Sequence, residues 1–188
     1  MKRRQKKRKV MLIGLLCLLG LTAAGMPVHA QKETPVSIQI VETPIRLEKV
    51  RAPTFGTYER TSHAQKVQAT SDLVIQVKDV RENKKTPWKL YYQLSHFSNG
   101  KEYAALLDLG KGSLRTLDGG QEVPSSPQHV SLTSNETKTL VTAYSTEASE
   151  YLYRVHKQAI NLLIPGDLPA GAFVAKQTVT LVNSPEAN

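Results

Sequence analysis

The chain has 188 residues, a formal net charge of +9 and a single cysteine. Seven of its 25 basic residues lie at residues 2–9, where no acidic residue occurs, and the remainder of the chain has 18 basic and 16 acidic residues. A nucleic-acid-binding domain usually carries a strong excess of basic residues. The near balance of charge beyond residue 9 therefore argues against nucleic acid as a partner.

Residues 1–30 have the three parts of a secretory signal peptide. The basic run at 2–9 is followed by an apolar run at 10–24, and small residues occupy the −3 and −1 positions of a cut at the end of this segment. The alternative is an uncleaved anchor, because Val10 to Val28 is nearly long enough to cross a bilayer. We expect cleavage and export, with no integral membrane segment in the mature chain. The cysteine leaves with the signal peptide, so the mature fold depends on its core without disulfides.

Beyond a short polar linker at residues 31–35, alternation of apolar and polar residues predicts a series of short strands. The alternating segments are residues 36–40, 45–49, 73–77, 88–94, 103–109, 113–117, 130–133, 140–144, 160–164 and 172–182. Residues 56–70 are polar without period and are expected to form a loop or an edge strand. A helix is an alternative prediction only for residues 146–157, where Thr146 is a suitable N-cap.

Turn signals separate these strands at short intervals. Asn99-Gly100 lies between two alternating runs and is typical of a β-hairpin. Two further glycine-containing turns follow, so the segments 88–94, 103–109 and 113–117 are predicted to form an antiparallel meander. No long amphipathic segment accompanies them. The pattern predicts an all-β fold, an antiparallel β-sandwich or barrel-like single domain, over residues 36–188.

The sequence offers no constellation of catalytic or metal-ligating residues. The mature histidines are scattered without ligand spacing, so we expect no metal site and no cofactor; they are His63, His96, His129 and His156. No nucleophile turn, phosphate-binding loop or nucleotide fingerprint occurs. A glycosidase needs a pair of carboxyl groups, and aspartate is one of the residue types that supply them. Aspartate is also usual at strand ends and turns for backbone reasons. We therefore expect no enzymatic activity.

Two motifs far apart in the chain resemble those of a known family. The proximal motif is Trp88-Lys89-Leu90, preceded by Asp79-Val80-Arg81, and the distal motif comprises Phe173, the segment 177–181 with Thr178 and Leu181, and Pro185. Their order resembles the WxL domain, a module of cell-surface proteins in low-GC Gram-positive bacteria. The chain departs from the family pattern at three positions: Phe173 replaces Tyr, Gln177 replaces Leu and Val179 replaces the second Trp.

The resemblance implies a secreted protein that is retained non-covalently on peptidoglycan of the cell wall. It also implies association with membrane-anchored WxL-interacting proteins and with other WxL proteins. No separate effector domain accompanies the module, which favours a small subunit of a surface complex.

Trp88 is the only tryptophan in the chain, and its role depends on the face of the strand that it occupies. Period-two alternation places Trp88 with Leu90, Tyr92 and Leu94, which favours a buried indole over a ligand platform. The distal segment repeats this pattern on one face, at Phe173, Ala175, Val179 and Leu181. The two motif strands are therefore predicted to meet inside a sheet.

Two modes of surface attachment follow. In the first, the module binds wall polymer directly through exposed aromatic residues and lysines near the tryptophan; the candidates are Lys84, Lys85, Lys89, Tyr91 and Phe97. In the second, it is an extracellular interaction module that pairs an edge strand or an apolar patch with a membrane-anchored partner, and its contact with the wall is indirect.

Overall fold

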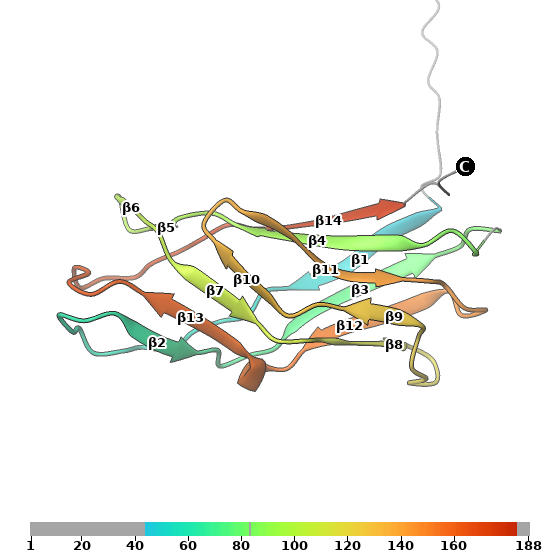
Figure 1. Ribbon diagram of the computed structural model, residues 1–188, viewed down its shortest axis with the longest axis horizontal. Coiled ribbons are helices and arrows are strands. Elements are labelled where there is room, and N and C mark those ends of the chain that lie inside the picture. Colours follow the sequence, from blue (N-terminus) through green and yellow to red (C-terminus); the bar gives the residue numbers. More distant parts are fainter. Residues whose placement is uncertain (1–43, 83, 184–188) are drawn as a thin grey trace, which may run out of the picture. The chain divides into compact units, whose positions relative to one another are not determined.

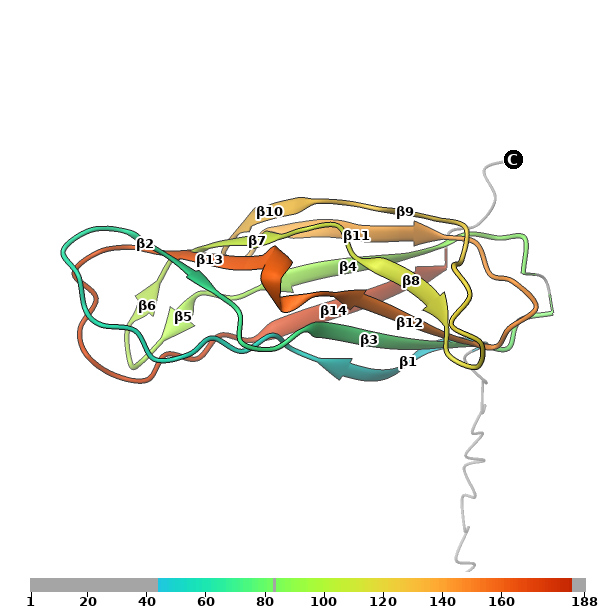
Figure 2. The ribbon, with the colours of Figure 1, turned by 90° about the horizontal axis from the view of Figure 1, so that it is seen from below.

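The computed structural model describes residues 44–82 and 84–183. The signal peptide, the linker, the strand predicted at 36–40 and Pro185 lie outside the described residues. Within the described part of the chain, regular structure consists of β-strands and one 3-10 turn, η1 (Lys157–Ala159). The predicted all-β, sandwich-like fold of antiparallel sheets is therefore confirmed (Figures 1 and 2).

The first sheet has the strand order β1-β3-β12-β8. Its strands are β1 (Ile45–Arg51), β3 (Leu73–Asp79), β12 (Glu150–Val155) and β8 (Ser113–Thr116), all paired antiparallel. Alternate residues of β3 and β12 are buried, as period two requires for a strand with one face on the core.

The second sheet has the order β10-β7-β13-β2. It comprises β10 (Val130–Thr133), β7 (Leu106–Leu109), β13 (Ile160–Ile164) and β2 (Gln65–Gln68). β2 is an edge strand, which is one of the two alternatives predicted for residues 56–70.

The third sheet has the order β14-β4-β11-β9 and contains both motif strands. Its members are β14 (Gln177–Asn183), β4 (Trp88–Leu94), β11 (Thr137–Ala143) and β9 (Ser125–Pro127). β14 pairs antiparallel with β4 in the register Leu181↔Leu90 and Val179↔Tyr92, so the predicted meeting of the motif strands is confirmed. A bulge interrupts the pairing of β11 with β4 between Thr139 and Val141.

The predicted meander is wrong. β4, β7 and β8 follow one another in the chain but lie in three different sheets. The Asn99-Gly100 turn closes only a two-residue ladder between β5 (Phe97–Ser98) and β6 (Glu102–Tyr103). Alternation determines which face of a strand is buried but not which strand is its neighbour, so the assumption that successive strands pair failed here.

Two further predictions need correction. Residues 146–157 form no α-helix, because Tyr151, Tyr153 and Val155 alternate toward the core in β12 and the large rings fill it at a period of two. The distal strand begins at Gln177 rather than at residue 172, which leaves Phe173 in the preceding loop.

The inward faces of all three sheets contribute to one hydrophobic core. Trp88, Tyr92, Tyr151 and Tyr153 are its largest fully buried side chains. Among the residues that the structure describes, no helix has the length and apolar character needed to cross a membrane.

Candidate functional site

Trp88 begins β4 and its indole is fully buried, which confirms the predicted core position. The ring lies 6.0 Å from that of Tyr151, centroid to centroid, at an interplanar angle of 52°. Its Nε1–H donates a hydrogen bond of 3.0 Å to the Ser145 hydroxyl. The polar atom of the indole is thus satisfied inside the protein, and no part of Trp88 is available to a ligand.

Asp79 and Arg81 form a buried, bidentate ion pair beside this indole. Arg81 Nε donates to Asp79 Oδ1 at 2.9 Å and Arg81 Nη2 donates to Asp79 Oδ2 at 2.7 Å. The Arg81 backbone N–H also donates to Oδ1, and the Ser145 hydroxyl donates to Oδ2. Burial raises the pKa of the Asp79 carboxyl, but these hydrogen bonds and the positive charge of Arg81 together hold that pKa below its usual value of 3.8.

The same cluster joins the two motifs. Arg81 Nη1 donates to Asn183 Oδ1 at 2.5 Å, and Asn183 is the last residue of β14, opposite Trp88 in the register with β4. We call Asp79, Arg81, Trp88, Ser145 and Asn183 the motif cluster. Each member lies at the end of a strand or within two residues of one. Hydrogen bonds among these side chains connect the proximal and distal segments.

Sequence reasoning missed Ser145 and Asn183. Ser145 follows β11 and belongs to neither motif, and Asn183 ends β14 within the distal motif but is not one of its defining positions. A buried ion pair needs further partners for its remaining donors and acceptors. That requirement is the one signal that polar residues from elsewhere in the chain had to reach Asp79 and Arg81.

The opposite face of the third sheet carries the candidate contact surface. On β4 the residues between the buried positions are Lys89, Tyr91 and Gln93, which are half-buried in the middle of the sheet. β14 places Thr178 opposite Gln93, Thr180 opposite Tyr91 and Val182 opposite Lys89. On the other side, β11 places Thr137 opposite Gln93, Thr139 opposite Tyr91 and Thr142 opposite Lys89.

Directly opposite residues of an antiparallel pair lie on the same face. These positions therefore form one surface, with Tyr91 at its centre and with Thr139 and Thr180 opposite it on the two neighbouring strands. We call it the hydroxyl face and define it by its polar positions, which exclude Val182; they are Lys89, Tyr91, Gln93, Thr137, Thr139, Thr142, Thr178 and Thr180. Thr137, Thr178 and Thr180 are exposed. The face offers five threonine hydroxyls, one amide, one phenol and one ammonium group.

The predicted contact residues do not form a single site. Lys89 and Tyr91 belong to the hydroxyl face. Lys84 lies in the loop before β4, where its Nζ donates to the backbone oxygens of Glu147 at 3.1 Å and Ala148 at 2.9 Å. Lys85 is exposed in the same loop. Phe97 is half-buried in β5, beyond the far end of β4.

The remaining motif residues are divided between the two faces. Leu90 is fully buried and Leu181 half-buried against the core, whereas Thr178 points outward on the hydroxyl face. Phe173 lies near Tyr103 at the other end of the sheet, with ring centroids 5.5 Å apart. The period-two arrangement thus gives each motif strand a structural side and an exposed side.

One group of side chains contains the residue types of a catalytic triad. His129 Nε2 and the Ser131 hydroxyl both contact Asp108 Oδ1 at 2.7 Å, on the outer surface of the second sheet. Burial raises the pKa of Asp108, but the hydrogen bonds from Ser131 and His129 outweigh it and the pKa is lowered overall. Nucleophilic catalysis requires the hydroxyl to donate to the imidazole. Here the hydroxyl donates to the carboxylate, so the geometry lacks the contact between nucleophile and base.

Two other histidines, His96 and His156, also have local partners. His96 Nδ1 contacts the Asn135 amide at 3.0 Å, and His156 Nδ1 accepts from the Gln158 backbone N–H at 3.4 Å. Within residues 44–82 and 84–183, no group of three or more His, Cys, Asp or Glu side chains is arranged to hold a metal ion.

Comparison of the chain with protein-family models, curated proteins and solved structures finds no match. The candidate sites therefore rest on the geometry and on the chemistry of the side chains.

Proposed function

We propose that the protein is a secreted binding module that is retained non-covalently at the cell wall, as a small subunit of a surface complex, and that it contacts wall polymer through the hydroxyl face. The observation that carries this proposal is the placement of Tyr91 between Thr139 and Thr180 on the exposed side of both motif strands. The resemblance of the motifs to those of the WxL domain supports the same assignment.

The chemistry of the face suits a glycan chain. Sugar rings present hydroxyl groups that both donate and accept hydrogen bonds, and apolar C–H faces that pack on aromatic rings. Threonine hydroxyls supply matching donors and acceptors, and Tyr91 supplies the ring. Gln93 Nε2 already donates to the Asn135 backbone oxygen at 2.8 Å, so the amide adds its oxygen and its second N–H. A sheet surface is also extended along its strands, which suits a linear polymer better than a compact ligand.

Lys89 adds a positive charge at one end of the face. Wall polymers that carry carboxylate or phosphate groups are attracted to such a charge, and the attraction weakens as salt screens it. We therefore expect binding to sacculi to decrease, but not to vanish, as the salt concentration rises. The burial of Trp88 means that the indole supports this surface from beneath and does not contact the polymer.

The test is co-sedimentation of residues 31–188 with purified, protein-free sacculi. Tyr91→Ala removes the central ring, and Thr180→Glu places a bulky anion on the exposed face without entering the core. Both variants are expected to remain in the supernatant while unfolding at a temperature close to that of the wild type.

Tyr58→Ala is the matched control, because Tyr58 is also partly exposed (43%) but lies in the loop after β1. It is expected to sediment like the wild type. If Tyr91→Ala and Thr180→Glu sediment normally, the hydroxyl face is not the contact surface. If the wild type itself fails to sediment, direct wall binding is refuted.

A second function is favoured by the edge position of β14. An edge strand presents unpaired backbone N–H and C=O groups, and a partner strand can add to it. β14 also exposes Val182 (37%), and the nearby Val174 is 72% exposed. In this alternative a membrane-anchored partner protein pairs with β14, and sedimentation occurs only after the partner has been added to the sacculi.

A further inference from the structure

A cavity of about 810 Å³ lies at the end of the sandwich where β4 finishes at Leu94. Three segments far apart in sequence surround it: the loop 52–61 after β1, the β5–β6 hairpin and the loop 165–175 before β14. Protein interiors leave few voids larger than a water molecule. A cavity of this size falls instead within the range of small-molecule binding sites, about 300–1,000 Å³.

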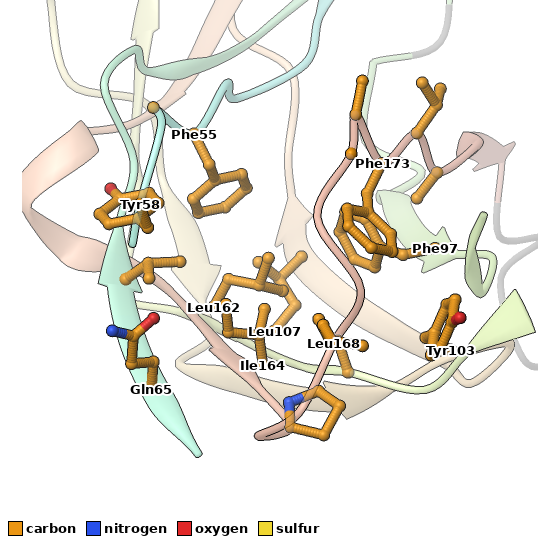
Figure 3. Close-up of a pocket in the computed structure, with 18 of the residues that line it drawn as sticks. Phe55, Tyr58, Gln65, Phe97, Tyr103, Leu107, Leu162, Ile164, Leu168 and Phe173 are labelled. Atoms are coloured by element: carbon orange, nitrogen blue, oxygen red, sulfur yellow. The ribbon is translucent and has the colours of Figure 1, made fainter. Parts of the chain in front are cut away.

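Aromatic rings form opposite walls of this cavity. Figure 3 shows Phe55 and Tyr58 on one side and Phe97, Phe173 and Tyr103 on the other, with aliphatic side chains between them. The Tyr58 hydroxyl donates to the Gln68 backbone oxygen at 2.8 Å. Its hydrogen-bonding capacity as a donor is therefore used within the protein, and only its ring is left to contact a ligand. Tyr103 and Phe173 meet edge to face at 77°, the packing that aromatic rings prefer.

The aliphatic floor is part of the hydrophobic core. Leu107 and Leu162 are buried in β7 and β13, and both line the cavity. Glu59 and Arg60 are the only charged residues of the lining, and both are exposed in the loop 52–61. Four further polar side chains line the cavity on the side of the loop 52–61 and β2; they are Thr54, Thr57, Thr61 and Gln65. The rest of the lining, apart from Gln177, is mostly aromatic or aliphatic, so apolar rings find most of their contacts there.

One polar atom in the lining has no partner. Gln177 starts β14 and lines the cavity, and its Oε1 is buried and accepts no hydrogen bond; no other side-chain nitrogen or oxygen within residues 44–82 and 84–183 is buried in this way. A buried acceptor without a donor is unfavourable, and such atoms in native proteins usually have a specific reason. Rotation of the Gln177 side chain toward the cavity would let an N–H or O–H group of a bound molecule supply the missing donor.

We propose that this cavity binds a small, mostly apolar molecule built of aromatic rings, which donates one hydrogen bond to Gln177 Oε1. The ring walls select the apolar body, and the glutamine selects the single donor. This site is separate from the hydroxyl face, because one lies at the end of the sandwich and the other on the outer surface of the third sheet.

The test uses N-phenyl-1-naphthylamine, an apolar fluorescent probe with one N–H group, titrated into residues 31–188. Saturable enhancement of its fluorescence is expected. Two competitors of similar shape are then compared: 2-naphthol, which has one O–H donor, and 2-methylnaphthalene, which has none.

Gln177→Leu removes the acceptor and keeps the wall apolar. The ratio of the 2-naphthol affinity to the 2-methylnaphthalene affinity is expected to fall roughly 3- to 10-fold in this variant, the range for one neutral hydrogen bond. Ala175→Phe fills space in the lining and is expected to abolish binding of the probe, provided that its thermal unfolding remains cooperative. Tyr91→Ala, on the hydroxyl face, is expected to bind the probe as the wild type does.

Absence of saturable probe binding by the folded wild type would overturn the proposal. An unchanged ratio in Gln177→Leu would overturn the role of the glutamine, and normal binding by Ala175→Phe would place the probe elsewhere. Because Tyr91→Ala separates the two surfaces, failure of the cavity proposal and failure of wall binding through the hydroxyl face give different results.

Discussion

Replacement of Asp79 by Asn tests the motif cluster most directly. In the wild type, Oδ1 accepts from the backbone N–H and Nε of Arg81, and Oδ2 accepts from Nη2 of Arg81 and the hydroxyl of Ser145. An asparagine has only one oxygen. Whichever way its amide is oriented, two of these four donors face an NH₂ group, and Arg81 loses its counter-charge in a site where only 6% of its side chain is exposed.

The expected loss is large because the pair is buried. Removal of one partner of a buried ion pair typically costs about 3–5 kcal/mol, since an uncompensated charge remains inside. In a domain of this size each kcal/mol lowers the melting temperature by about 2–4 °C. Asp79→Asn should therefore melt about 6–20 °C below the wild type at pH 7.

The pH dependence provides a second measurement. The folded-state pKa of Asp79 is depressed, so the stabilisation by this carboxylate is present above its unfolded value of 3.8 and is lost as the pH falls through the folded value. The gap in stability between the wild type and Asp79→Asn should be constant near neutral pH and should narrow below pH 3.8.

Thermal unfolding followed by circular dichroism, at several pH values, measures both effects. Asp108→Asn is the matched control, because Asp108 also accepts from two side chains but lies nearer the surface, with 30% of its side chain exposed. It should cost about 1 kcal/mol or less. Equal melting temperatures for Asp79→Asn and the wild type at pH 7 would refute the structural role of the motif cluster.

Three further changes test other parts of the structure by thermal or spectroscopic measurement. Trp88→Phe keeps an aromatic ring but removes the donor to Ser145, so it should destabilise the protein by about 1–3 kcal/mol; unchanged stability would contradict the internal role of the indole N–H. Gln177→Leu removes a buried acceptor that has no partner, and should raise the free energy of unfolding of the ligand-free protein by about 1–3 kcal/mol; a loss of stability would mean that Oε1 is satisfied in solution. Gly112→Ala would place a Cβ 2.5 Å from Cζ of the buried Tyr153, and should cost about 1–3 kcal/mol through overpacking; a neutral outcome would show that this part of the core is loosely packed.

The division of each motif strand into two faces was predictable from sequence. Alternation placed Trp88 with Leu90 on the core side, and the same rule placed Lys89 with Tyr91 on the other side. These predictions hold because the side-chain period of a strand is a local property of the backbone. The all-β fold followed from the same alternation repeated along the chain, together with closely spaced turns.

The neighbours of each strand were not predictable. The strands β4, β7 and β8 were expected to pair in sequence order, yet each lies in a different sheet. The choice of partner depends on how the apolar faces of all strands are buried together, which is a property of the whole core. The secondary structure of the segment around Tyr151 and Tyr153 was also ambiguous from sequence, because the local residues allow a helix. Only the assembled core, in which both rings are buried at alternate positions, selects a strand.

The sequence by itself determined the fold class, the buried side of each strand and the internal position of the one tryptophan, because these depend on local period and hydrophobicity. Tertiary structure alone decided which residues meet across the chain: Ser145 and Asn183 at the Asp79–Arg81 pair, the threonines of β11 and β14 beside Tyr91, and the rings around the cavity near Gln177. Those groupings depend on strand register and on loop paths between residues that lie more than a hundred positions apart in the chain. No local pattern of residues encodes them, since the free energy that selects them comes from contacts formed only when the whole core assembles.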